Sequence, residues 1–121
     1  MTTTPVASSS SLPRASEPQL LAATTTVEHR SRTAAVHLSG ELCTTTAPRL
    51  RRLLGELLEL GPTSVVVDLS QLQLCTSHGI DVLDQAARQL AATGGRLRIL
   101  GASGIVRKVL DIAGVEHEAP R

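Results

Sequence analysis

Residues 65–83 read VVVDLSQLQLCTSHGIDVL, and this stretch combines two periodicities. It opens with three consecutive valines, a run without alternation that is typical of a central strand buried on both sides. After Cys75 the apolar residues recur at helical spacing, beginning with Ile80 and Leu83 and continuing to Leu90. The stretch therefore predicts a buried strand, a short loop over residues 75–79 and an amphipathic helix.

The residues that precede this stretch predict a hairpin and a helix. Residues 19–28 and 33–38 are rich in Thr, Val and Ala, with a turn around Ser31 and a close at Ser39 and Gly40. Beyond them, the hydroxyls of residues 44–46 can cap a helix, and a leucine stripe at three- and four-residue spacing starts at Leu50. Gly61 and the proline after it end this helix.

The residues that follow predict one more strand and one more helix. Residues 93–95, Thr-Gly-Gly, end the second helix; residues 97–100 suit a strand, and residues 103–112 suit a helix with Ser103 as its N-cap. The segment GASGIVRK lacks the spacing of a phosphate-binding loop, so we do not expect it to bind a nucleotide. The order of strands and helices predicts one α/β domain whose later strands are parallel.

Composition excludes several classes of function. The chain has 121 residues, 41% of them hydrophobic, a formal net charge of +1 and no aromatic residue. It therefore offers neither a basic field nor stacking rings for nucleic acid, and no apolar run reaches the roughly 20 residues that span a bilayer. We expect no nucleic acid and no membrane among its partners.

The first residues differ in composition from the remainder of the chain. Residues 1–17 are rich in Ser, Thr and Pro and lack the basic and apolar regions of a signal peptide. We predict a disordered tail over residues 1–17 and a folded domain over residues 18–121. The absence of a signal peptide predicts a cytoplasmic protein whose two cysteines are reduced thiols.

No catalytic constellation can be assembled from the sequence, so we predict no enzyme, no cofactor and no metal. The four histidines show no metal-binding spacing, and His37 is expected on a strand surface. One alternative stays open, because Cys43, Cys75 and His78 could meet at one edge of the sheet. They would then form a transition-metal site or a thiol–imidazole pair.

Four segments in register resemble the STAS family, in its anti-sigma factor antagonist type: VHLSGELCTTTAPRL (36–50), residues 65–83, GGRLRILGASGIVRKVL (94–110) and DIAGVEH (111–117). The resemblance implies a four- to five-stranded mixed sheet with about three or four helices mainly on one face. It also implies a partner, an anti-sigma factor of the ATP-binding serine kinase type. In such proteins, phosphorylation of the loop before the second helix ends the binding.

The sequence departs from the family pattern around that loop. Aligned through Gly79, the loop Asp of the family falls on Thr76, and the usual phosphate acceptor falls on His78. Cys43 stands where the family has the Asp of a Gly-Glu-Leu-Asp turn. Ser77 and Thr76 are the candidate acceptors, and the alternative is that Ser77 serves only as the N-cap of the second helix. A protein without an acceptor would bind constitutively or respond to thiol state.

The resemblance places the partner-binding surface on the turn before the first helix and the loop before the second. The residues expected in it are Cys43, Thr44, Thr45, Thr76, Ser77, His78, Gly79, Ile80 and Asp81. The competing hypothesis is a non-catalytic scaffold or oligomerising module of a larger signalling assembly. We expect a monomer or a weak dimer. Size in solution helps to discriminate between the two hypotheses, because a scaffold should self-associate and an antagonist need not.

Overall fold

The computed structural model describes residues 21–118, so the predicted tail over residues 1–17 lies outside the described residues. The strands and helices follow the predicted order. The strands are β1 (Leu21–Glu28), β2 (Thr33–Leu42), β3 (Ser64–Cys75) and β4 (Arg96–Leu100), and the helices are α1 (Ala47–Glu59), α2 (Ser77–Ala92) and α3 (Gly104–Ala113).

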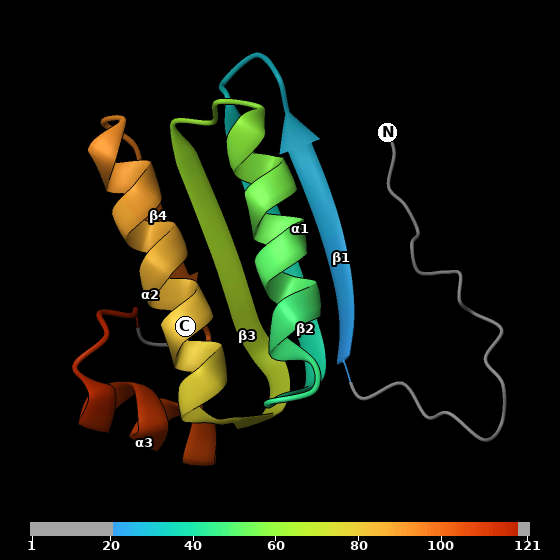
Figure 1. The fold of residues 1–121 in the computed structure, drawn as a ribbon, viewed down its shortest axis with the longest axis vertical. Coiled ribbons are helices and arrows are strands. Elements are labelled where there is room, and N and C mark those ends of the chain that lie inside the picture. Colours follow the sequence, from blue (N-terminus) through green and yellow to red (C-terminus); the bar gives the residue numbers. More distant parts are fainter. Residues whose placement is uncertain (1–20, 119–121) are drawn as a thin grey trace, which may run out of the picture.

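The strands form one mixed sheet in the order β1-β2-β3-β4, with β1 antiparallel to β2 and the remaining neighbours parallel. Figure 1 shows α1 and α2 side by side across the same face of this sheet, with α3 next to the start of α2. An isolated parallel bridge between Leu100 and Glu118 adds the beginning of a fifth strand. The predicted α/β fold and its four- to five-stranded sheet are confirmed.

The core lies between the sheet and the helices. Val65 and Val67 on β3 are fully buried, as are Leu54 on α1 and Leu83 on α2. Val66 is only half-buried because it points to the opposite face, which none of the described helices covers. The prediction that the valine run is buried on both sides is therefore wrong for Val66.

The strand β2 is longer than its pattern indicated. β2 continues past Gly40 to Leu42, because a register shift on either side of Gly40 lets the strand bend while it stays paired with β3. Gly40 has φ of 98°, a value that suits glycine at such an irregularity. The extra length carries Leu42 to a position opposite Cys75, and this pair brings the predicted site together.

The turns after α1 and α2 fall at the glycines that predicted them. Gly61, Gly94 and Gly114 follow α1, α2 and α3 with positive φ. Within residues 21–118, no helix is both long and apolar enough to pass through a bilayer.

Candidate functional site

Two connections meet at the carboxyl ends of β2 and β3. Leu42 and Cys75 are the last paired residues of these strands, and the N–H of Thr76 donates to the carbonyl of Leu42 at 2.9 Å. The turn that leads into α1 and the first turn of α2 are therefore neighbours. We call residues 43–46 together with residues 76–81 the α2 junction.

The turn before α1 is held by Thr46, the one buried polar residue in the described chain. Its hydroxyl accepts a hydrogen bond from the N–H of Cys43 at 2.8 Å and donates to the carbonyl of Glu41 at 2.9 Å. Thr46 is the N-cap of α1, but its side chain makes no capping bond to the helix. The predicted capping position is thus correct, while the hydroxyl stabilises the turn rather than the helix.

The start of α2 differs from the prediction by one residue. The N-cap is Thr76, and Ser77 is the first helical residue, so the alternative of Ser77 as N-cap is wrong. The hydroxyl of Thr76 is buried and has no hydrogen-bond partner among the described residues. Ser77 is exposed, and its hydroxyl lies at the helix end where backbone N–H groups are free and the dipole favours anions.

Gly79 allows α2 to approach the end of β2 closely. A Cβ atom at this position would lie 2.4 Å from Cγ of Leu42 and 3.3 Å from Sγ of Cys75, and Leu42 is fully buried. Ile80 is 5% exposed and belongs to the core. Gly79 and Ile80 therefore position the loop from beneath, although both were expected in the partner-binding surface.

Two separate contacts join exposed side chains of the α2 junction. Oγ1 of Thr44 lies 3.1 Å from Nδ1 of His78, which links the turn to the helix. Sγ of Cys43 lies 3.3 Å from Oγ1 of Thr45. Asp81 is exposed one turn into α2, whereas Asp84 is paired with Arg88 at 2.9 Å.

The two cysteines have opposite environments. Hydrogen bonds from Thr45 and Thr46 lower the pKa of the Cys43 thiol, the Thr45 hydroxyl having the largest effect. Burial raises the pKa of the Cys75 thiol to about 11. Cys75 faces the core and Cys43 faces the turn. They do not converge on His78, and residues 21–118 contain no group of three metal-ligating side chains.

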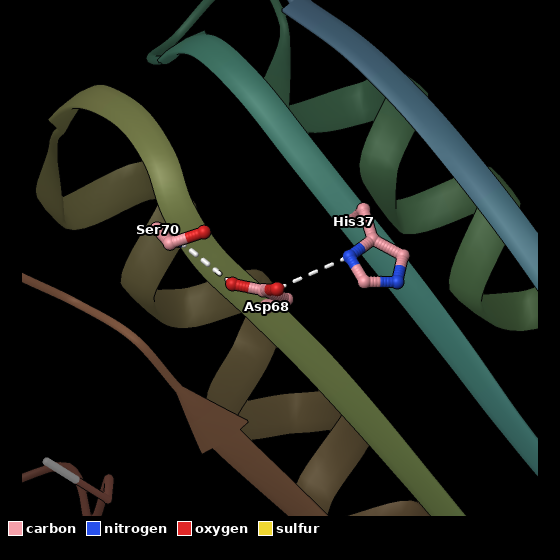
Figure 2. A network of polar contacts seen from close by, with 3 residues as sticks. All are labelled: His37, Asp68 and Ser70. Atoms are coloured by element: carbon pink, nitrogen blue, oxygen red, sulfur yellow. Dashed lines mark hydrogen bonds and ion pairs between the residues drawn. The ribbon is translucent and has the colours of Figure 1, made fainter. Parts of the chain in front are cut away.

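Sequence reasoning missed a polar network on the uncovered face of the sheet. Figure 2 shows His37 on β2 and Asp68 on β3, with Nδ1 of His37 at 3.1 Å from Oδ2 of Asp68. The N–H of Ser70 donates to Oδ1 of Asp68 at 2.9 Å, and this bond, with a smaller effect of His37, lowers the pKa of Asp68. His37 is exposed as expected, but its partner depends on the register of β2 and β3.

Known proteins resemble the chain in sequence pattern and in fold. The family model of the STAS domain matches residues 24–120. The anti-sigma factor antagonist SpoIIAA in its unphosphorylated form gives a TM-score of 0.69 at 24% identity, over 78% of this chain and 86% of that chain. An anti-sigma factor antagonist from Mycobacterium paratuberculosis gives a TM-score of 0.65 at 29% identity, over 77% and 79% of the two chains.

A further structure shows the Bacillus cell fate determinant SpoIIAA in its phosphorylated form. It gives a TM-score of 0.61 at 24% identity, over 74% of this chain and 83% of that chain. A comparison with curated proteins finds no match.

Proposed function

Because the chain belongs to the STAS domain family, we propose that it is an anti-sigma factor antagonist. It would bind an anti-sigma factor in the cytoplasm, without catalysing a reaction, and so release a sigma factor to act in transcription. The Mycobacterium paratuberculosis protein supports this proposal, since it is an anti-sigma factor antagonist of similar fold at 29% identity. The partner that we propose is an anti-sigma factor of the ATP-binding serine kinase type.

We choose this contact surface on one observation. The exposed side chains of the α2 junction lie together above closely packed residues. Thr44 and His78 are in contact across the two connections, and Ser77 lies next to His78 at the start of α2. Below them Leu42 and Gly79 pack without a gap, so the surface is held in place before a partner arrives. We propose that Thr44, Ser77, His78 and Asp81 contact the partner directly.

Of the two candidate acceptors, the structure favours Ser77, because the hydroxyl of Thr76 is buried. We propose that the bound kinase transfers the γ-phosphoryl group of ATP to Oγ of Ser77. The serine hydroxyl loses its proton, a P–O bond forms and ADP leaves. Free N–H groups at the start of α2 accommodate the phosphate, so the domain stays folded. The added charge of about −2 repels or obstructs a partner on the same surface.

The test uses Ser77→Asp beside a matched control, Ser103→Asp. Both serines are exposed at the start of a helix, but Ser103 precedes α3 and lies outside the α2 junction. Each full-length protein is used to capture partners from an extract of the source cells, and the anti-sigma factor recovered is then titrated by calorimetry. We expect wild type and Ser103→Asp to bind it equally and Ser77→Asp to bind it at least about 10-fold more weakly.

Two outcomes would contradict the proposal at different levels. If wild type retains no anti-sigma factor, the antagonist function is wrong. If all three proteins bind the anti-sigma factor with the same affinity, the function stands and the contact surface is elsewhere. Mass spectrometry after incubation of wild type with the captured kinase and ATP tests the acceptor, since a phosphate on any residue other than Ser77 refutes that assignment.

A further inference from the structure

The two edges of the sheet are closed to different extents. At the β4 edge, Glu118 donates its N–H to the carbonyl of Ile99 at 2.7 Å, and its carboxylate forms a two-point ion pair with Arg98. At the other edge, none of the described residues pairs with the outer side of β1. Its sequence, LAATTTVE, contains no Pro, Lys or Arg, the residues that commonly guard an exposed edge strand.

A groove runs between this open edge and α1. It has a volume of about 180 Å³, and its apolar lining includes Leu21, Ala23 and the half-buried Leu53. Nη1 of Arg49 donates to the carbonyl of Leu21 at 2.9 Å and fixes the start of α1 beside the start of β1. An edge strand next to an apolar groove offers backbone hydrogen bonds and side-chain burial to one more strand.

The sign of the charge changes along the groove. Arg49 and Arg52 lie toward the start of α1, and Glu56 follows Arg52 by one helical turn. The end of α1 lies beside the end of β1, where Leu57 and Val27 line the same pocket, so helix and strand run alongside each other. Neither Arg52 nor Glu56 has an ion-pair partner among the described residues.

We propose that the occupant of this groove is a second copy of the chain, paired antiparallel through β1 about a two-fold axis near Thr24. Reversal of direction across such an axis places Arg52 of each copy beside Glu56 of the other, so the interface complements itself in charge. The two sheets become one continuous sheet of eight strands. The small side chains of Ala22, Thr24 and Thr26 leave the two backbones free to approach each other.

The geometry indicates a weak dimer. One strand edge and one side of one helix make an interface at the small end of those that hold proteins together, so we expect a dissociation constant of about 10 μM. The charged pairs are exposed, so added salt should weaken the dimer. β1 and α2 lie on opposite sides of α1, so each copy keeps its α2 junction accessible (Figure 1). The dimer does not rest on the proposed function.

The test is sedimentation of the full chain from about 1 μM to about 1 mM, a range that brackets the expected constant. Arg52→Glu and Glu56→Arg each place like charges opposite each other across the two-fold axis, and we expect each variant to dimerise at least about 10-fold more weakly. Arg51→Glu is the control, because Arg51 is the adjacent exposed arginine, undergoes the same charge change and does not line the groove.

Mixing the two variants gives the decisive measurement. A chain with Glu at 52 and 56 complements a chain with Arg at both positions, so the mixture should form a heterodimer at least as well as wild type. If the wild-type chain stays monomeric throughout, another partner or residues 1–20 of the same chain occupy the groove, and the proposal is overturned. A dimer that Arg51→Glu weakens as much as Arg52→Glu, or a mixture that fails to associate, overturns it as well.

Discussion

The α2 junction and the strand ends beneath it form an exposed half and a buried half that differ in packing. Leu42, Cys75 and Gly79 pack against one another under the surface, whereas Thr44 and Ser77 lie on top of it. The positions of the first group are fixed by close packing, because any added atom would overlap a buried neighbour. The second group has open space around it. Stability should therefore depend on the buried half, and the exposed half is free to be modified or to bind.

Among the substitutions that test this contrast, truncation of Leu42 should have the largest effect on stability. Leu42→Ala deletes a fully buried side chain from the contact with α2 and should lower the free energy of unfolding by about 3 kcal/mol. Thr44→Ala, two residues later, removes only an exposed hydroxyl and should cost about 0.5 kcal/mol or less. Urea unfolding followed by circular dichroism measures both values. Equal losses would show that the exposed half also supports the fold.

The reactivity of the two cysteines also distinguishes the exposed half from the buried half. Cys43 is accessible and its hydroxyl neighbours lower its thiol pKa, while the Cys75 thiol is 2% exposed with a pKa of about 11. Only the thiolate reacts with iodoacetamide, so Cys43 should be alkylated at least ~100-fold faster near pH 8. Peptide mass spectrometry over a time course gives both rates. A comparable rate at Cys75 in the native protein would mean that the junction opens readily.

Sequence alone was sufficient for the architecture because it depends on patterns that repeat. The leucine stripe of α1, the valine run of β3 and the glycines after α1 and α2 repeat or mark an element end, and each predicted its element. The site depends instead on single contacts between segments distant in sequence. Ser77 lies inside the helix, the hydroxyl of Thr76 is buried and Cys75 faces the core. These placements depend on one-residue differences in register, which the periodicity of the sequence does not determine.

The network of His37 and Asp68 illustrates the same limit. Each residue could be placed on a strand surface from its neighbours, yet their contact requires the parallel register of β2 and β3. The open edge of β1 could not be predicted either, since a strand at an edge and a strand in the centre have similar sequences when the side chains are small.

Alanine substitutions at two glycines distinguish the effect of close packing on stability from the effect of helix propensity. Gly79→Ala places a Cβ atom 2.4 Å from Cγ of Leu42, so we expect a loss of about 1–2 kcal/mol even after the gain in helix propensity. Gly55→Ala in α1 meets no atom within 4 Å, and it should stabilise the protein by up to about 1 kcal/mol. Urea titration of both variants gives the two signs. A stabilising Gly79→Ala would mean that α2 does not press against β2.

The smallest effect should come from Asp68, a half-buried residue on the uncovered face. Its pKa is lowered in the folded protein, chiefly by the N–H of Ser70, so the carboxylate stabilises the fold above the unfolded pKa of about 3.9. This contribution is lost as the pH falls through the lower folded pKa. Asp68→Asn should therefore cost about 0.5 kcal/mol at pH 7, and the difference from wild type should shrink below about pH 4.

Urea titrations of both proteins at several pH values measure that difference. The comparison with Leu42→Ala then tests whether ionic contacts on the open face matter less than packing beneath the helices, as their exposure indicates. A loss at pH 7 as large as that of Leu42→Ala, or a difference that persists unchanged into acid, would show that Asp68 supports the sheet by something other than its charge. A small Asp68 effect would thus show that this ionic contact on the open face contributes less to stability than the packing beneath the helices.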